Sequence, residues 1–107
     1  MVSRVITCNI KPSHIEEFRS AITDRYLPRI QAQQGFLENV ESVDPATGRY
    51  CCLTLWQSPA DVANYDNGLF QEIAAHLVPM MDGAPNVETL TVDNSSVHNV
   101  KAGRAAA

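Results

Sequence analysis

The sequence predicts an α+β fold in which two helices cover one face of a four-stranded antiparallel sheet. The main evidence is the order of the hydrophobic patterns, which alternate between strand-like and helix-like periods as β-α-β-β-α-β. A turn-forming segment at residues 44–48 joins the two middle strands directly, as in a hairpin. The 107 residues, 45% of them hydrophobic and 19% charged, are enough for one core and too few for two. Together these features predict a ferredoxin-like domain.

The first strand and the first helix are predicted at the N-terminal end of the chain. Residues 3–10 have apolar side chains on both strand faces, which favours a position inside the sheet. Residues 13–16, Ser-His-Ile-Glu, have the pattern of a capping box that opens a helix. Pro28 is expected to kink or divide this helix near Leu27, and Gly35 to end it. The predicted buried stripe consists of Ile15, Phe18, Ile22, Tyr26 or Leu27, and Ile30.

The middle of the chain predicts a hairpin followed by a helix. Residues 36–43 and 49–57 have the β-branched and aromatic composition of strands. Ser58 then stands where an N-cap is expected, with Pro59 at the first helical position. A helix is therefore predicted to begin here, and Asp-Asn-Gly at residues 66–68 is expected to break it.

A second helical segment and a last strand complete the domain. Residues 69–80 form the predicted helix, which residues 82–85, Asp-Gly-Ala-Pro, are expected to stop. Its apolar side is predicted to contain Leu69 or Phe70, Ile73, Leu77 and Met80. Residues 87–92 form the last strand. The predicted organisation is one domain at residues 1–93, followed by a C-terminal tail or arm at residues 94–107.

The two faces of the strand at residues 49–57 differ in chemistry, because side chains alternate across a strand. One face is small and apolar, and we expect it to pack under the helices: Cys51, Leu53 and Leu55. The other carries groups that hydrogen-bond: Tyr50, Cys52, Thr54 and Trp56. We expect this second face to be a pocket wall that looks toward a second copy of the chain, since monomers rarely expose broad apolar patches. The sequence thus predicts a homodimer.

Charge and composition exclude several classes of function. The formal charge is −4 and the cationic residues are scattered, so nucleic acid is not an expected partner. No apolar run reaches the roughly 20 residues that span a bilayer, and the N-terminus lacks a signal-peptide pattern, so we expect a cytoplasmic protein without membrane contact. The three cysteines are predicted to be free thiols. The sequence contains no metal-ligand cluster, phosphate-binding loop or nucleophile elbow, so no bound metal is expected.

Two short segments resemble a known family. Gly35-Phe36 leads into the hairpin, and residues 55–60, Leu-Trp-Gln-Ser-Pro-Ala, end the third strand and open the next helix. These segments, with the βαββαβ order, resemble the antibiotic biosynthesis monooxygenase family of dimeric α/β barrels over residues 3–92. The resemblance implies a dimer with one pocket per subunit between sheet and helices. It also implies oxidation of anthrones or related aromatic substrates to quinones by O₂, without metal or flavin.

Some, but not all, of the pocket residues of this family are matched in the sequence. Trp56 matches the tryptophan that lines the pocket in these enzymes. Cys52 stands where they have an asparagine, and Val62 where they have a tyrosine. Tyr65 falls where the haem-degrading branch has a pocket tryptophan. In that branch a histidine binds the haem iron; the position is filled here by Ala74, and the nearest histidine is His76.

The candidate site follows from the half-polar strand face and this resemblance. The predicted catalytic residues are Trp56, Tyr65 and His76, and the predicted substrate-binding residues are Tyr50, Cys52, Thr54, Val62 and Phe70. Each catalytic candidate has a structural alternative: Trp56 in a dimer core, Tyr65 packed on a helix, His76 structural or exposed. The leading prediction is a cofactor-independent monooxygenase acting on an aromatic or quinone-type substrate. The alternatives are a haem-degrading protein, with haem as cofactor, and a non-catalytic dimeric module that binds small molecules.

Overall fold

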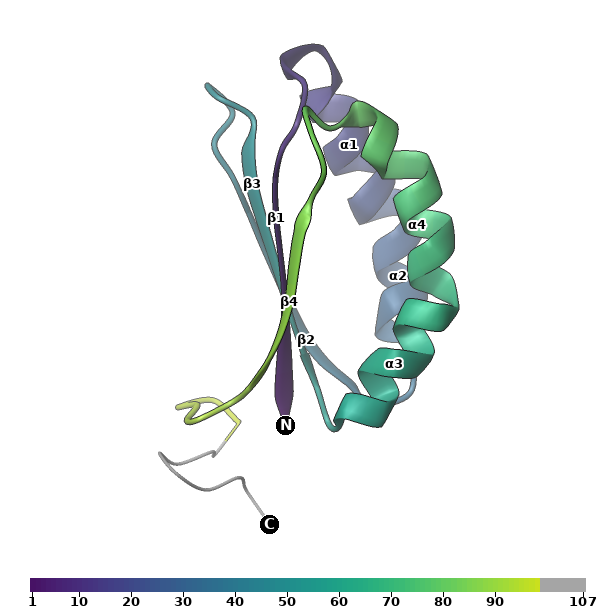
Figure 1. Cartoon of the computed structure of the whole chain (residues 1–107), viewed down its shortest axis with the longest axis vertical. Coiled ribbons are helices and arrows are strands. Elements are labelled where there is room, and N and C mark those ends of the chain that lie inside the picture. Colours follow the sequence, from purple (N-terminus) through teal and green to yellow (C-terminus); the bar gives the residue numbers. More distant parts are fainter. Residues whose placement is uncertain (99–107) are drawn as a thin grey trace.

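A computed structural model describes residues 1–98 and shows a twisted sheet with helices on one side only (Figure 1). The strands are β1 (Val2–Asn9), β2 (Phe36–Val43), β3 (Arg49–Trp56) and β4 (Asn86–Thr91). They lie in the order β2-β3-β1-β4, and every neighbouring pair is antiparallel. The predicted α+β architecture is confirmed, and the long first strand lies inside the sheet as expected.

The first helical rod divides where the proline predicts a break. It consists of α1 (Ile15–Ser20), a π-helical segment (Ala21–Tyr26) and α2 (Leu27–Gln31), with Pro28 in the first turn of α2. The wider turns of the π-helix place Tyr26, rather than Leu27, on the buried side. Its buried residues are Ile15, Phe18, Ile22, Tyr26 and Ile30, so the predicted stripe is confirmed.

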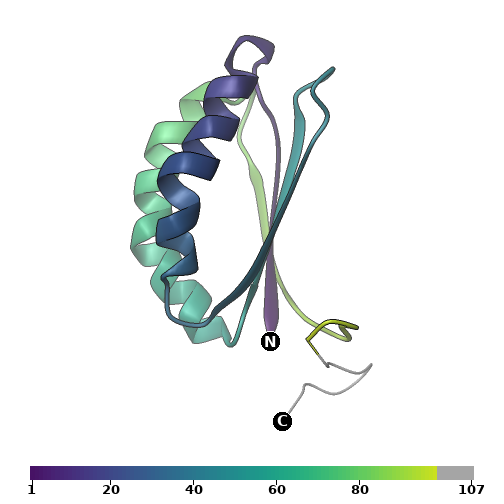
Figure 2. The same ribbon diagram turned by 180° about the vertical axis from the view of Figure 1, so that it is seen from behind.

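The second rod consists of α3 (Pro59–Asn67), α4 (Leu69–Leu77) and a closing 3₁₀ turn (Val78–Met80). The Ser58 hydroxyl accepts a hydrogen bond from the Asp61 backbone N–H at 3.3 Å, which confirms the predicted N-cap. The rod breaks at Gly68, as the sequence predicts. The two rods lie side by side across the same face of the sheet (Figures 1 and 2).

Two predicted helix ends are wrong in detail. The capping box at residues 13–16 does not form, because Pro12–His14 makes a 3₁₀ turn and His14 takes the N-cap position without a side-chain hydrogen bond. The first rod ends at Gln31, before Gly35. Gly35 instead has a φ of +82° in the turn that leads into β2, where a Cβ would lie 2.1 Å from the Asp61 carboxylate. Glycine is required there by both conformation and space.

The assignment of the two faces of β3 is wrong. The register pairs Tyr50, Cys52, Thr54 and Trp56 with the β1 residues Cys8, Ile6, Arg4 and Val2. These residues point toward the helices: the Phe18 and Tyr50 rings lie 4.9 Å apart, and so do the Trp56 and Tyr65 rings. The small apolar residues, Cys51, Leu53 and Leu55, lie on the face that the helices leave open. The large aromatic side chains gain more from burial under the helices than the smaller ones, and their polar atoms find partners there.

The chain after β4 turns onto the open side of the sheet, away from the helices (Figure 2). Residues 92–96 border a shallow groove with Leu53, Leu55 and Leu90. His98 lies 3.2 Å from the Glu38 carboxylate on β2. Residues 99–107, the larger part of the predicted tail, lie outside the described residues. The division into a domain and a C-terminal arm therefore stays a prediction.

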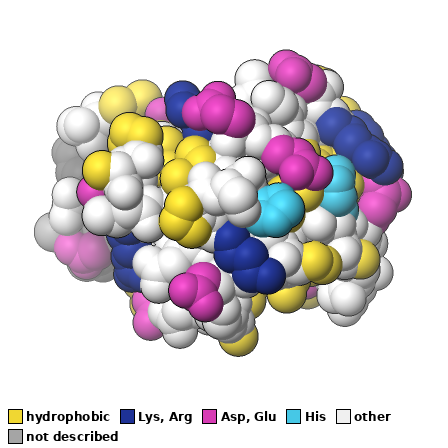
Figure 3. All heavy atoms as spheres, turned by 90° about the horizontal axis from the view of Figure 1, so that it is seen from above, with side chains coloured by type: hydrophobic (Ala, Val, Ile, Leu, Met, Phe, Trp, Pro, Cys, Tyr) yellow, Lys and Arg dark blue, Asp and Glu magenta, His cyan; other side chains and the backbone are white. Residues whose placement is uncertain are grey.

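The end of the molecule that carries the hairpin turn mixes side chains of both charge signs with small apolar areas (Figure 3). Within residues 1–98, no helix has the length and apolar character needed to cross a membrane. The same part of the chain holds no group of three or more His, Cys, Asp or Glu residues placed to bind a metal ion.

Candidate functional site

A narrow pocket with a free volume of about 50 Å³ lies between the sheet and the two helical rods. The sheet contributes Ile6, Asn39, Tyr50, Cys52 and Thr54 to its wall. The helices contribute mostly apolar side chains, among them Phe18, Ile22, Tyr65, Phe70, Ile73 and Ala74. Val78, Met81 and Pro85 border it where the second rod turns toward β4. The pocket therefore has one wall with polar groups and one wall that is almost wholly apolar.

A chain of hydrogen bonds runs along the polar wall. The Tyr50 hydroxyl donates to one Glu41 carboxylate oxygen at 2.8 Å, and the Asn39 amide donates to the other at 3.1 Å. The Cys52 thiol in turn donates to the Asn39 carbonyl at 3.3 Å. Asn39 and Glu41 thus orient the predicted pocket residues Tyr50 and Cys52.

Sequence reasoning missed Asn39 and Glu41, although a signal existed. In the hairpin register Asn39 lies opposite Thr54 and Glu41 opposite Cys52, so all four share the face under the helices. The period of two along a strand would have placed them together once the pairing was known. Cys52 stands where the resembling family has an asparagine, and the structure supplies an asparagine from the adjacent strand, in contact with Cys52.

The titratable groups of the wall are held in their protonated forms. Burial, reinforced by the negative charge of Glu41, raises the pKa of Cys52 to about 12. Burial also raises the pKa of Tyr50 and the pKa of Tyr65 above their ordinary values. At neutral pH the pocket therefore presents neutral hydrogen-bonding groups rather than a thiolate or a phenolate.

Tyr65 lies between the buried Trp56 ring and the pocket. Its ring stacks on Trp56 with centroids 4.9 Å apart and tilts against Phe70 at 5.7 Å. It is 95% buried and lines the pocket. Among residues 1–98 its hydroxyl has no hydrogen-bond partner, so this hydroxyl is free to bind a ligand.

Trp56 supports the pocket from behind and does not line it. The side chain is fully buried, with its indole N–H donating to the Thr54 hydroxyl at 2.8 Å. Its ring makes an edge-to-face contact with Phe36, with centroids 5.7 Å apart, and stacks on Tyr65. Val62 is also buried in the core and does not line the pocket. The structure thus brings together five of the predicted site residues as pocket lining: Tyr50, Cys52, Thr54, Tyr65 and Phe70.

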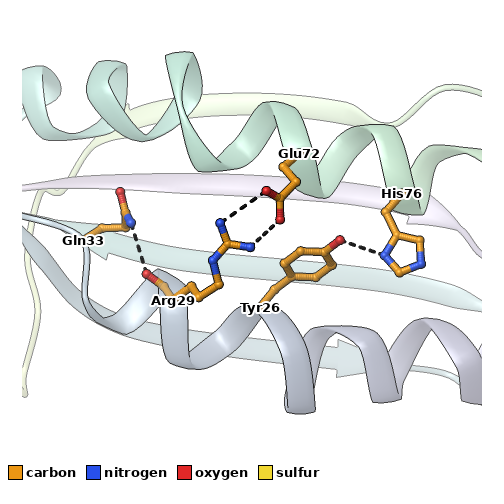
Figure 4. A network of polar contacts seen from close by, with 5 residues as sticks. All are labelled: Tyr26, Arg29, Gln33, Glu72 and His76. Carbon is orange, nitrogen blue, oxygen red and sulfur yellow. Dashed lines mark hydrogen bonds and ion pairs between the residues drawn. The ribbon is translucent and has the colours of Figure 1, made fainter.

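His76 points toward the neighbouring rod instead of the pocket (Figure 4). Its Nδ1 lies 2.8 Å from the hydroxyl of Tyr26, whose side chain is fully buried. Nearby, Arg29 forms an ion pair with Glu72 across the same two rods. His76 therefore fastens the helices together, and it is Ala74, two residues earlier on α4, that lines the pocket.

The residues present do not fit haem. None of the histidines within residues 1–98 lines the pocket: His14 contacts Glu17, His76 contacts Tyr26 and His98 contacts Glu38. The remaining possible iron ligands in the wall are the Met81 thioether, the Cys52 thiol and the tyrosine hydroxyls, and burial raises the pKa of the thiol and of the hydroxyls of Tyr50 and Tyr65. The predicted alternative of haem binding thus lacks a histidine ligand in this pocket.

Similar solved structures exist, while no protein-family model and no curated protein matches the chain. A Caulobacter crescentus protein provisionally assigned as an antibiotic biosynthesis monooxygenase is 24% identical, with 85% of this chain and 88% of that chain covered and a TM-score of 0.73. A variant of SnoaB, a cofactor-independent oxygenase from Streptomyces nogalater, is 14% identical over 89% and 95%, with a TM-score of 0.70. MhuD, a heme-degrader from Mycobacterium tuberculosis with two hemes bound in its active site, is 17% identical over 89% and 98%, also with a TM-score of 0.70. At such identities the likeness establishes the shared fold, which is the fold that the resemblance in sequence implies.

Proposed function

We propose that this protein is a monooxygenase of the antibiotic biosynthesis monooxygenase family and acts on a flat aromatic phenol without a cofactor. The observation that carries the proposal is the two-sided pocket, with polar groups along the sheet wall and apolar side chains on the helix wall. A flat ring system with oxygens along one edge matches the chemistry of both walls, and the pocket of about 50 Å³ has to widen to admit it. The shared fold with a cofactor-independent oxygenase supports the same reaction class.

The reaction needs few catalytic groups from the protein, because the substrate itself supplies the electrons to O₂. An anthrone-type substrate that loses a proton becomes an electron-rich anion, which can transfer an electron to O₂ directly. One oxygen atom then becomes the new carbonyl of the quinone, and the other leaves as water with the two hydrogens of the reacting carbon. The residues of the pocket bind and orient the ring, keep water out, and place the Tyr65 hydroxyl where it can donate to the substrate oxygen.

Replacing Tyr65 with phenylalanine is expected to reduce oxygen uptake with an anthrone substrate by about tenfold to a hundredfold, since it removes one hydrogen-bond donor to the developing charge. The measurement is oxygen consumption in a closed electrode chamber together with quinone absorbance. The matched control is Tyr26→Phe, which removes a hydroxyl that contacts His76 outside the pocket. Oxygen uptake equal in wild type and the Tyr65 variant, or absent from wild type, would contradict the proposal. Tight ligand binding without any uptake would favour a non-catalytic binding module.

We further propose that the active form is a homodimer joined through the open face of the sheet. That face carries apolar side chains that the helices leave uncovered: Val5, Val40, Leu53 and Leu90. Leu55 on the same face is already buried. Val40 and Leu90 are 47% and 52% exposed, which is unusual for aliphatic side chains in the middle of strands. A second copy of the same face would cover them.

Replacing Leu53 with arginine is expected to convert the dimer to a monomer, because a charge would be buried at the centre of the interface. Sedimentation velocity at micromolar concentration measures this directly. Ala75→Arg, an exposed position on α4, serves as the control and should remain dimeric. A wild-type protein that sediments as a monomer would rule the assembly out.

A further inference from the structure

Arg4 is a buried cation whose presence packing does not explain. It lies on β1, on the face under the helices, and is only 3% exposed. Its guanidinium forms an ion pair with Asp66 on α3 and lies 4.8 Å from the centre of the Phe70 ring. Its Nε has no hydrogen-bond partner among the described residues. An apolar residue in place of a buried ion pair is often neutral or stabilising, and an unpaired buried donor costs free energy.

The guanidinium lies directly behind the pocket wall. Thr54 is the cross-strand neighbour of Arg4, and Ile6 is the next residue on the same face of β1. Both line the pocket, as does Phe70. Burial raises the pKa of Cys52 and the pKa of Tyr65. The positive charge of Arg4 acts in the opposite direction and offsets part of this increase.

Two hydroxyl protons are free beside Arg4. The Thr54 oxygen accepts the indole N–H of Trp56, which can only donate, so the proton of Thr54 remains available. The Tyr65 hydroxyl has no partner among residues 1–98. By contrast, the hydroxyl of Tyr50 is already committed to Glu41 and the thiol of Cys52 to Asn39. The unused donors therefore lie on the Thr54 side of the pocket, where Arg4 supplies positive charge.

We propose that Thr54, Tyr65 and Arg4 form an oxyanion subsite, so that a phenolic or enolic ligand binds as its conjugate base. The proposal rests on the proposed function and specifies the form in which the substrate is held. Thr54 and Tyr65 donate hydrogen bonds to the oxyanion, and such charge-assisted bonds are about twice as strong as neutral ones. Arg4 acts through them as a positioning residue. Asp66, paired with Arg4, and Glu41, on the opposite side of the wall, both weaken its field.

The test uses alizarin, a dihydroxyanthraquinone dye whose visible absorbance reports its ionisation. In wild-type protein the pH midpoint of the bound dye should fall below that of the free dye by about one pH unit. A unit charge about 4 Å away at an effective dielectric constant of about 20 would lower it by about three pH units, and burial and the charges of Asp66 and Glu41 reduce this shift. Arg4→Met should raise the midpoint. Asp66→Asn should lower it further, because the charge of Arg4 is then no longer offset. Opposite shifts from the two members of one ion pair do not arise from a general loosening of the fold.

Arg4→Lys retains the charge and should keep the midpoint near the wild-type value. Asp66, whose side chain is 34% exposed, can be replaced with little risk to folding, so the test does not depend on the Arg4→Met variant being stable. Bound dye with the same midpoint in wild type, Arg4→Met and Asp66→Asn would overturn the oxyanion subsite and leave the proposed reaction standing. Shifted midpoints without oxygen uptake would support the subsite and overturn the reaction. No binding of the dye by wild type would overturn both.

Discussion

Replacing Trp56 with alanine is expected to lower the free energy of unfolding by about 3–5 kcal/mol, the usual cost of removing a large aromatic side chain from a core. The indole is fully buried and contacts the rings of Phe36 and Tyr65, so its loss would leave a cavity in the core. Thr54 would also lose the hydrogen bond from the indole N–H. Urea unfolding followed by circular dichroism measures the change.

The size of this effect separates two roles for Trp56. A tryptophan that formed an open stacking platform would cost little stability when removed, so a loss below about 1 kcal/mol would contradict the buried supporting role. Because small domains are stable by only about 5–15 kcal/mol in total, the alanine variant is expected to be near the limit of folding. Trp56→Phe serves as the control: it refills most of the volume and should cost about half as much or less.

The strands and helices could be predicted because their signals are local. Pro28 in the first rod, Ser58 with Pro59 at the start of α3, and Gly68 between the last two helices each act on the residues next to them. The predicted capping box at residues 13–16 does not form because Pro12 begins a 3₁₀ turn that includes Ser13 and His14. Local sequence signals therefore explain both the helix boundaries that were predicted correctly and the capping box that was not.

The orientation of β3 could not be predicted, because it depends on partners far along the chain. The polar atoms of its half-polar face suggested a pocket wall that faces a second copy of the chain. In the structure those atoms are satisfied within the subunit: the Trp56 indole by Thr54, the Tyr50 hydroxyl by Glu41 and the Cys52 thiol by Asn39. With their polar atoms paired, the large rings gain the full benefit of burial under the helices.

The pocket residues also differ in whether a local pattern could predict them. Tyr65 and Phe70 lie on helices whose buried sides follow from the helical period, and both line the pocket. Asn39 and Glu41 can be assigned to the site only when the pairing of β2 with β3 is known. Arg4 can be assigned to it only when its position across from Thr54 is known. Arg4 is the one charged residue in β1, and its ion pair with Asp66 cannot be inferred from the local sequence.

Replacing Ala74 with tryptophan is expected to abolish both alizarin binding and oxygen uptake, because an indole at this position would occupy the space between sheet and helices that the ligand has to enter. Ala74 is the smallest side chain that the second rod presents to the pocket, so a large residue there grows into the ligand space. Arg4, Thr54 and Glu41 lie on strands of the sheet, whereas Ala74 lies on α4. Dye titration by absorbance and the oxygen electrode measure the two losses on the same preparation.

The next residue on α4 offers the matched control. Ala75 is exposed and does not line the pocket, so Ala75→Trp adds the same side chain to the same helix and should leave binding and uptake close to wild type. Equal thermal stability of the two variants would show that any difference comes from blocking the pocket rather than from misfolding. If Ala74→Trp retained full oxygen uptake, the reaction would have to occur outside the space between sheet and helices, and the roles assigned to Tyr65, Thr54 and Arg4 would fail together.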